Sequence, residues 1–336
     1  MKRNSEKRDR WRLQCVLLLC IITTTLFQCR SDPESIDQYP SRPVTYLVPW
    51  APGGMTDMTS RIMGATLQKW LDQPVSVINR TGGGGVIGHL ALSQAKPDGY
   101  TLGAMTVEIT MLHHLGLTHL TYSDFTPLAL LVNNPAAITV RADAPWNALS
   151  ELMSAIRQNP EQYKASGTAR GGIWDLARIG WLQASGISPN ALPWVPSQGA
   201  APAMQELLAG GVDVVTASLQ EVDALRKSGQ VKTLAVMAKE RLSAYPEVPT
   251  LKELGIDWDI GGWVAISAPP SMDERKLFKL DSIVRLAVRD KELEDALVKA
   301  GSTVQVLTGS DLNAFLAEQD VLHGDLIGRA GTFKTN

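Results

Sequence analysis

The fold of this chain is decided by one stretch, Val44-Thr45-Tyr46-Leu47-Val48-Pro49-Trp50-Ala51-Pro52-Gly53-Gly54-Met55-Thr56-Asp57. Its first five residues predict a short buried strand, and a Gly-Pro turn joins this strand to a helix capped by Thr56 or Asp57. Such a turn leaves backbone N–H groups bare and directs a helix N-terminus at the same point. Backbone alone therefore forms a candidate anion site, and similar bends recur along the sequence.

The composition is typical of a soluble globular protein. The chain has 336 residues, of which 44% are hydrophobic and 20% charged, and this length predicts two compact lobes. The formal net charge of −2 is unevenly divided. Residues 1–29 hold six basic and two acidic residues, which leaves 26 basic and 32 acidic residues, a net charge of −6, in the remainder. Nucleic-acid binding is disfavoured, because it requires a basic face.

Residues 1–29 have the pattern of a bacterial signal peptide. A basic head precedes the uncharged stretch Leu13–Cys29, whose apolar core is Val16–Ile22, and polar residues follow from Arg30. A permanent membrane-spanning helix is the alternative, but the run is near the lower limit of about 17–25 residues for such a helix. Residues 30–42 are polar and proline-containing, which predicts a linker to the folded part.

All three cysteines, Cys15, Cys20 and Cys29, lie inside this signal. The body of the protein therefore has no disulfide, thiol nucleophile or cysteine metal site. Cys29 stands where the apolar segment becomes polar, as in bacterial lipoprotein signals, and Leu26-Phe27-Gln28-Cys29 supplies the Leu and the Cys of a lipobox. Lipidation of Cys29 and simple cleavage nearby both stay open, and a lipid would only tether the protein to a membrane.

From residue 43 onward, strand and helix patterns alternate, which predicts an α/β fold with parallel sheets covered by helices on both faces. The expected strands are Val44–Val48, Val75–Ile78, Thr101–Met105, Ala137–Val140, Tyr163–Ser166, Val212–Thr216 and Lys232–Met237, and the region after Ile266 is expected to be mainly helical. We found no internal repeat. We expect residues 43–138 and 265–336 in one lobe and 139–264 in the other, with a ligand cleft between them.

A second glycine bend is formed by Thr81, Gly82, Gly83, Gly84 and Gly85, after one predicted strand and before a helix. It contains a formal G-x-G-x-x-G match. A dinucleotide site is nevertheless disfavoured, because Asp98, the acidic residue at the right distance, lies in a turn instead of ending a strand. No Gly-Lys-Ser/Thr follows, which excludes a P-loop.

A third bend comprises Ser166, Gly167, Thr168, Ala169, Arg170, Gly171 and Gly172. A cation at a helix start, such as Arg170, faces the positive end of the helix dipole unless an anion lies between them. This mismatch indicates a carboxylate partner from ligand or protein, and a solvated surface arginine is the alternative. The fourth candidate is Gln198 with Gly199, before Pro202, and the fifth is Ser218 with Glu221 after a strand.

The remaining candidates each have a structural alternative. Glu108, close to Thr106, is either a pocket acceptor for a ligand hydroxyl or ammonium group or an ordinary loop charge. Asp57 as an acid–base group is less simple than Asp57 as a helix cap. The three histidines His113, His114 and His119 match no common zinc spacing and have no carboxylate nearby in sequence, so we predict no metal site. No catalytic residue and no cofactor is predicted.

Several motifs occur together in this chain. They are Tyr39-Pro40-Ser41-Arg42-Pro43, Val48–Gly54, Thr56-Asp57, Asn79-Arg80 with the glycine run, Pro97–Leu102, Gly210–Asp213, Leu234–Val236 and Pro246–Thr250. In this order they resemble the substrate-binding receptors of the tripartite tricarboxylate transporters, the TctC or Bug family. The resemblance spans roughly residues 39–330.

The resemblance implies a two-lobed type II periplasmic-binding fold that closes over a small di- or tricarboxylate. It also implies delivery to a permease of one large and one small membrane subunit. In such receptors, backbone amides and bridging water hold the carboxylates at positions that correspond here to Ala51–Asp57, Thr81–Gly85 and Ser166–Gly172. Met55, Arg170 and Asp175 depart from the family pattern, and Arg170 and Asp175 could pair with each other.

The leading prediction is therefore a monomeric, exported solute receptor without catalysis. Two other functions use the same cleft. One is a ligand-sensing module that signals to a membrane partner, and the other is an exported enzyme with Asp57 or Glu108 as the acid–base group.

Overall fold

The structure is a computed structural model that describes residues 36–330. Contacts divide the chain into two units, Met1–Ser41 and Arg42–Asn336, and residues 36–38 of the first unit form a turn. The predicted signal peptide, with Cys29, lies outside the described residues. Across residues 36–330 no helix has the length and apolarity needed to cross a membrane.

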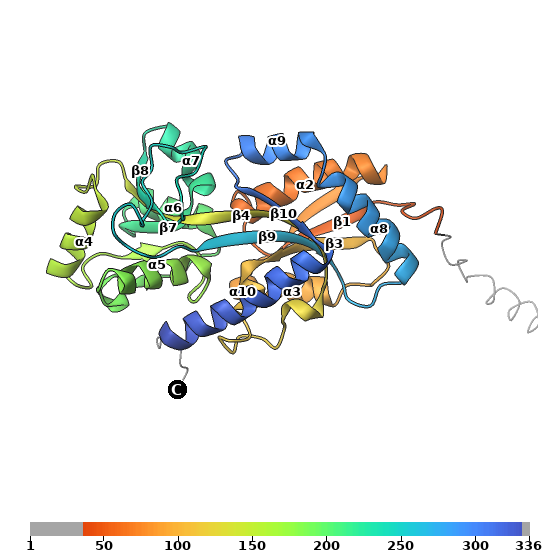
Figure 1. Ribbon diagram of the computed structural model, residues 1–336, viewed down its shortest axis with the longest axis horizontal. Helices are drawn as coiled ribbons and strands as arrows, with labels where there is room; N and C mark the ends of the chain where they lie inside the picture. Colours follow the sequence, from red (N-terminus) through yellow and green to blue (C-terminus); the bar gives the residue numbers. More distant parts are fainter. Residues whose placement is uncertain (1–35, 331–336) are drawn as a thin grey trace, which may run out of the picture. The chain divides into compact units, whose positions relative to one another are not determined.

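The second unit is a mixed α/β structure (Figure 1). Its strands are β1 (Val44–Val48), β2 (Val75–Asn79), β3 (Thr101–Thr106), β4 (Thr126–Arg141), β5 (Ala165–Ser166), β6 (Trp194–Val195), β7 (Val214–Ser218), β8 (Val231–Val236), β9 (Gly261–Ala268) and β10 (Val304–Thr308). Its helices are α2 (Met55–Leu71), α3 (Val86–Ser93), α4 (Leu149–Gln158), α5 (Ile173–Ala184), α6 (Ala200–Ala209), α7 (Leu219–Lys227), α8 (Glu274–Ala287), α9 (Lys291–Lys299) and α10 (Gly309–Ala330). Short 3₁₀ turns are η1 (Gly83–Gly85), η2 (Val107–Thr110), η3 (Tyr122–Asp124) and η4 (Pro189–Ala191).

The strands pair in the order β2-β1-β3-β9-β4-β7-β5-β6, and β10 and β8 also pair with β4. Pairing is parallel within β2-β1-β3 and within β7-β5-β6. The strands β4, β9, β8 and β10 join these groups in antiparallel ladders. The expectation of parallel pairing is therefore correct for these two groups and wrong for β4, β8, β9 and β10, which pair only in antiparallel ladders.

Strand β4 belongs to both lobes of this two-lobed fold. Residues Thr126–Pro135 pair with β9, whereas Ala136–Arg141 pair with β7 and β8. At the change of partner, the buried side chain of Asn134 accepts a hydrogen bond from the Thr303 N–H at 2.6 Å and donates one to Gln220 Oε1 at 2.7 Å. These two hydrogen bonds satisfy the buried amide of Asn134 and fix the position where β4 changes its partner. The lobe limits given above stay a prediction.

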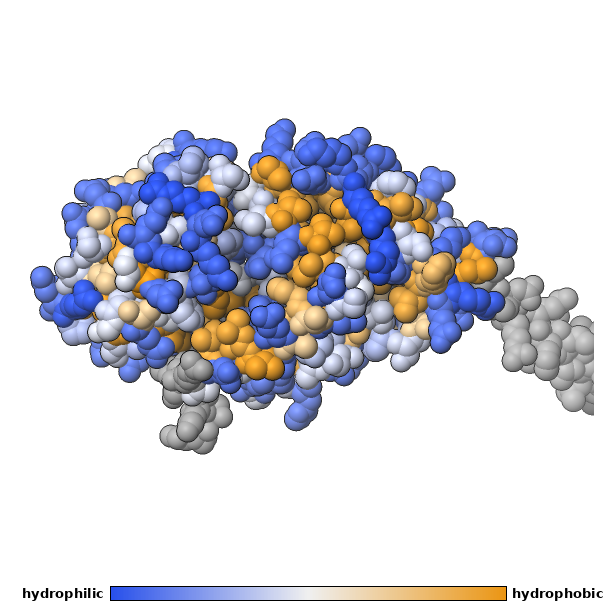
Figure 2. Space-filling view, in the orientation of Figure 1, coloured by the Kyte–Doolittle hydropathy of each residue, from blue (hydrophilic) through white to orange (hydrophobic). Residues whose placement is uncertain are grey.

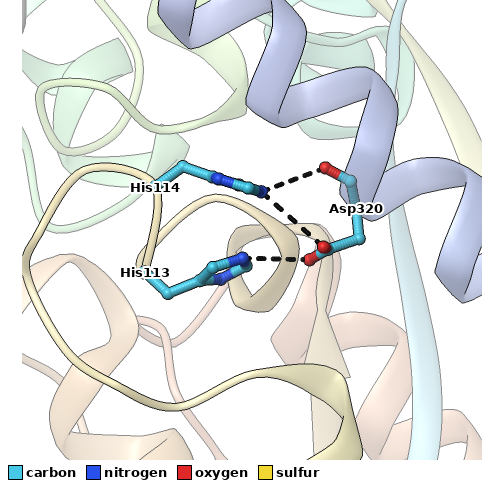
Figure 3. Close-up of side chains that lie close together, drawn as sticks. All are labelled: His113, His114 and Asp320. Atoms are coloured by element: carbon cyan, nitrogen blue, oxygen red, sulfur yellow. Dashed lines mark hydrogen bonds and ion pairs between the residues drawn. The ribbon is translucent and has the colours of Figure 1, made fainter.

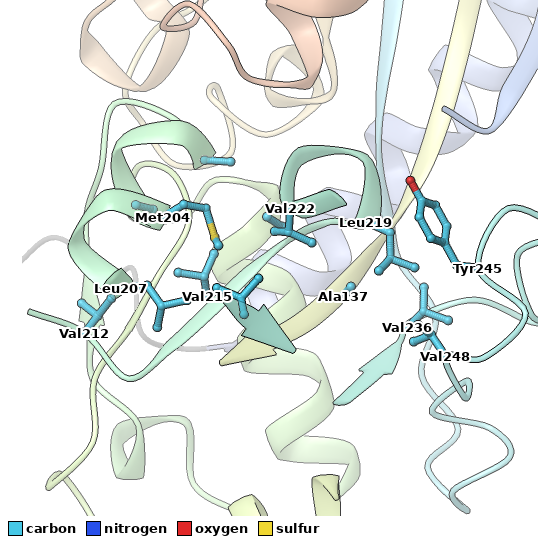
Figure 4. Close-up of a cluster of buried hydrophobic side chains, with 14 of the residues drawn as sticks. Ala137, Met204, Leu207, Val212, Val215, Leu219, Val222, Val236, Tyr245 and Val248 are labelled. Carbon is cyan, nitrogen blue, oxygen red and sulfur yellow. The ribbon is translucent and has the colours of Figure 1, made fainter. Parts of the chain in front are cut away.

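The core of the second lobe lies around β7 (Figure 4). Met204 and Leu207 on α6, Val215 on β7 and Val222 on α7 are almost fully buried there. Burial of such side chains contributes roughly 1.5–3 kcal/mol each, which fixes the helices on the sheet. The surface in Figure 2 is mostly hydrophilic with scattered apolar areas, and Phe278 on α8 and Val321 on α10 are among the exposed apolar side chains.

Most expected strands exist within a few residues of their predicted limits, but one is much longer than predicted and three others were not predicted. The sequence pattern predicted only Ala137–Val140 of the 16-residue strand β4. Pro127 and Pro135 concealed the rest, because proline removes a ladder donor, and register shifts accommodate the irregular part of this strand. The strands β6, β9 and β10 were not among the expected strands at all.

Candidate functional site

The first bend lies between β1 and the start of α2. Gly54 is the N-cap in extended conformation, and Asp57 stands in the first turn of the helix. Its carboxylate accepts hydrogen bonds from the Gly53 N–H and from Asn79 Nδ2, both at 2.9 Å. The prediction that Thr56 or Asp57 is the N-cap is therefore wrong: the N-cap is Gly54, and Asp57 lies inside the first turn, where its side chain reaches back to the bend.

The environment of Asp57 fits this structural role. Burial pushes the pKa of the carboxyl upward, but hydrogen bonds from Arg61, Gly53 and Asn79 outweigh burial and hold the pKa below its usual value. A carboxylate that stays ionised and is satisfied by its own bend is poorly suited to exchange protons with a substrate. Asp57 therefore stabilises the conformation of the first bend.

The third bend has the same arrangement, in which an aspartate of the first helical turn accepts a hydrogen bond from a glycine N–H of its own bend. Gly172 is the N-cap of α5, and Asp175 in the first turn accepts a hydrogen bond from the Gly171 N–H at 2.9 Å. The spacing Gly-Gly-x-x-Asp occurs at residues 53–57 and again at residues 171–175. We found no internal repeat from the sequence, and this five-residue pattern is the signal that was overlooked. It places the N-terminus of one helix from each lobe in the same local geometry.

The partner of Asp175 is Arg178, which is not among the predicted site residues. Its guanidinium contacts Asp175 Oδ1 at 2.7 Å, and both side chains are buried. Its Nη1 also donates to the carbonyl oxygens of Pro189 and Leu192. Arg170, by contrast, is exposed, so the expected alternative of an Arg170–Asp175 pair is not formed.

The glycine bends of the two lobes face each other. A Cβ added at Gly84 in the second bend would lie 3.2 Å from the Cβ of Ala169 in the third. A Cβ at Gly199, the N-cap of α6, would lie 3.6 Å from the Cβ of Ala51 in the first bend. Gly84 has a φ of +65°, a conformation that glycine adopts without cost. Absence of side chains thus lets backbone from opposite lobes approach closely.

Two glutamates connect the lobes at these helix starts. Glu221 at the start of α7 accepts a hydrogen bond from the Met55 N–H of α2 at 3.0 Å, while its other oxygen accepts from the backbone N–H of Ser218. Glu108, on η2, accepts a hydrogen bond from the Thr106 hydroxyl at 2.6 Å and another from the backbone of Ile173, the first residue of α5. Each helix N-terminus is therefore met by a carboxylate from the opposite lobe, as the helix dipole favours.

The bends and glutamates enclose one cavity of about 20 Å³, roughly the space of one water molecule. Of the predicted site residues, it is lined by Ala51, Gly54, Met55, Thr56, Glu108, Thr168, Gly199 and Glu221. The lining also includes Trp50, Val107, Ile173, Trp174 and Ala200. The Thr168 hydroxyl is buried and has no hydrogen-bond partner within residues 36–330.

The other predicted site residues do not line this cavity. They are Pro52, Gly53, Asp57, Thr81, Gly82, Gly83, Gly84, Thr106, Ser166, Gly167, Ala169, Arg170, Gly171, Gln198 and Ser218. Thr106 and Ser218 stand behind the lining, since they hydrogen-bond the carboxylates of Glu108 and Glu221.

Burial raises the pKa of Glu108 above its usual value, and hydrogen bonds from Thr106 and the backbone oppose this only in part. The folded protein therefore binds more protons than the unfolded chain at pH values between the ordinary and the raised pKa. We expect the free energy of unfolding of the wild type, relative to Glu108→Gln, to fall as the pH rises above the ordinary pKa of a glutamate. Urea unfolding at several pH values measures this difference. Glu240 is exposed and serves as the control. The same fall with pH, measured for the wild type relative to Glu240→Gln, would contradict the assignment to Glu108.

The histidines are arranged differently from the prediction. His113 and His114 lie together with Asp320 of α10, whereas His119 is exposed and outside this group. The missing carboxylate was invisible in the sequence because Asp320 is 206 residues from His114.

Residues 59–332 match the model of the tripartite tricarboxylate transporter family receptor. Protein BugT of Bordetella pertussis is 29% identical over 316 residues, which cover 92% of this chain and 94% of BugT. A second Bordetella pertussis protein, of the UPF0065 group, is 30% identical over 319 residues, which cover 94% of this chain and 97% of that protein.

Solved structures show the same similarity. The periplasmic binding protein BugD is 28% identical with a TM-score of 0.81, and the match covers 87% of this chain and 99% of BugD. MatC from Rhodopseudomonas palustris, solved with bound malate, is 27% identical with a TM-score of 0.76, over 86% of this chain and 100% of MatC. A TctC solute-binding protein from Polaromonas is 34% identical with a TM-score of 0.63, over 87% of this chain and 99% of that protein.

Proposed function

Because this chain belongs to the tripartite tricarboxylate transporter receptor family, we propose that it captures a small organic carboxylate outside the cytoplasm and delivers it to the permease of such a transporter. The observation that carries the proposal is the meeting of two Gly-Gly-x-x-Asp helix starts, one from each lobe, at a single cavity. Helix N-termini bind carboxylates through bare N–H groups and the helix dipole. The receptor works by binding alone and catalyses no reaction.

The lining of the cavity refines the ligand class. Within residues 36–330 it contains two carboxyl groups, Glu108 and Glu221, and no lysine or arginine. A ligand made only of carboxylates would face these groups without a cation to offset the repulsion. We propose a ligand that carries a hydrogen-bond donor beside its carboxylate, as a hydroxy acid does. The malate bound in MatC is consistent with this class.

Binding proceeds by closure of the lobes. A cavity of about 20 Å³ cannot admit an organic acid without opening. A ligand that contacts both helix starts stabilises the arrangement in which the lobes meet, and so shifts the population toward the closed form. The closed receptor is the form that the permease recognises.

The cellular location of the protein is inferred from residues 1–29, which lie outside the described residues. The signal-peptide pattern of residues 1–29 supports export, and BugD, a similar protein, is a periplasmic binding protein. We propose a periplasmic location for the mature protein. Lipidation of Cys29 stays a prediction, which mass spectrometry of the mature N-terminus tests.

The proposal is tested by isothermal titration calorimetry on a panel of malate, succinate, citrate, aspartate and acetate. We expect Kd values of about 1 μM or lower for an acid that carries a hydroxyl or amino group, and weaker binding of succinate, the matched acid without it. Small-angle scattering should show a smaller radius of gyration with ligand. No binding across the panel would contradict the proposed function. Equal binding of malate and succinate would contradict only the donor requirement.

A further inference from the structure

Two adjacent histidines and one aspartate from distant parts of the chain meet in the first lobe (Figure 3). His113 and His114 lie in the segment that follows η2, and Asp320 lies on α10. His113 Nε2 is 3.3 Å from Asp320 Oδ1, and His114 Nε2 is 3.7 Å from Asp320 Oδ2. One potential ligand atom from each of the three residues lies within 4.8 Å of the others.

This geometry points to a binding site for one Zn²⁺ ion, held by His113, His114 and Asp320. Zinc bonds to histidine nitrogen and carboxylate oxygen are about 2.0–2.2 Å long, so neighbouring ligand atoms in a tetrahedral site are roughly 3.3–3.5 Å apart. The two nitrogen–oxygen distances of 3.3 and 3.7 Å are close to this spacing. Imidazole and carboxylate ligands suit zinc, and water completes the fourth position.

His114 Nε2 lies 3.1 Å from the backbone oxygen of Asp320, a hydrogen bond that a bound ion would replace (Figure 3), and two other polar atoms of the group have no partner. Asp320 Oδ1 and His113 Nδ1 are buried, and neither has a hydrogen-bond partner of normal geometry within residues 36–330. Unpaired buried polar atoms are costly in a folded protein. A zinc ion bound to Asp320 Oδ1 would satisfy this oxygen. The 3.3 Å contact between Asp320 Oδ1 and His113 Nε2 would be replaced by two bonds to the ion.

A glycine on α10 makes room for one of the ligands. A Cβ added at Gly324 would lie 2.7 Å from His114 Cε1 and 2.8 Å from His114 Nε2. The imidazole of His114 can therefore occupy its position only because residue 324 has no side chain, although glycine is a poor residue inside a helix. The ion would join α10 to the segment that follows η2, which carries Glu108 of the cavity.

The test is a Zn²⁺ titration of the full, untagged chain whose three cysteines have been alkylated, since thiolates would also bind zinc. Calorimetry should give one ion per chain, and Zn²⁺ should raise Tm. Co²⁺ should give the absorption of a four-coordinate site without thiolate ligands. We expect Asp320→Asn and His114→Ala to weaken Zn²⁺ binding at least about tenfold, the loss that even partners of metal ligands produce.

Two further variants separate a metal site from a general effect on the fold. Gly324→Ala removes no ligand atom, but it displaces the His114 ring and should also weaken binding at least about tenfold. His119→Ala, at an exposed position of the same segment, should bind like the wild type. Absence of saturable binding, or equal affinity in all these folded variants, would overturn the assignment. Circular dichroism without metal verifies that each variant is folded.

Discussion

Arg178→Ala should lower the free energy of unfolding by about 3–5 kcal/mol, the loss expected when one partner of a buried ion pair is removed. The side chain of Arg178 is 6% exposed and that of Asp175 only 1%. Without Arg178, the Asp175 carboxylate stays buried with no cation, and the carbonyl groups of Pro189 and Leu192 lose a donor. Urea denaturation followed by circular dichroism measures the change.

The first bend provides the matched control. Arg61 pairs with Asp57 of the first bend at 2.9 Å, as Arg178 pairs with Asp175, but the side chain of Arg61 is 51% exposed. Arg61→Ala should therefore cost only about 1 kcal/mol, because water replaces an exposed cation well. The double change Asp175→Asn with Arg178→Met should recover part of the loss, since no charge remains buried. Equal losses in Arg61→Ala and Arg178→Ala would contradict this explanation.

Glu221→Ala should weaken ligand binding by about 10- to 150-fold, which corresponds to a charge-assisted hydrogen bond of about 1.5–3 kcal/mol. The Glu221 carboxylate accepts the Met55 N–H across the two lobes, so this bond exists only when the lobes meet. Removal of the bond lowers the population of the closed form, and the apparent affinity falls with it. Calorimetry with the best ligand of the panel gives the ratio of Kd values.

Glu221→Gln should lose nearly as much affinity as Glu221→Ala. Both carboxylate oxygens accept hydrogen bonds, one from Met55 and one from Ser218, so an amide NH₂ would face an N–H group. Glu240→Gln, at an exposed position of the same lobe, is the control and should bind normally. Tighter binding by Glu221→Ala would mean that Glu221 competes with the ligand for the start of α2.

The sequence predicted the candidate site in part. It identified the glycine bends and both glutamates, because a strand followed by a glycine turn and a helix start is a local pattern. It missed Trp174 and Ile173 in the cavity lining, since nothing in the neighbouring sequence marks these two apolar residues as part of a site. It also missed Arg178, although the repeated Gly-Gly-x-x-Asp spacing could have drawn attention to the helix that carries it.

The sequence by itself determined the features that depend on neighbouring residues. These are the alternation of strands and helices, the glycine bends that precede helices at Gly53-Gly54 and Gly171-Gly172, and the absence of cysteine chemistry from the body of the protein. Backbone conformation at a glycine bend is set within a few residues by steric limits on φ and ψ. Such features can therefore be inferred before the fold is known.

Only the tertiary structure decided which of these features meet. Met55 and Glu221 are 166 residues apart, and His114 and Asp320 are 206 residues apart. The sheet order, with β4 shared by both lobes, brings these pairs together. Contacts of this kind arise from the packing of whole lobes, and no local spacing in the chain records them.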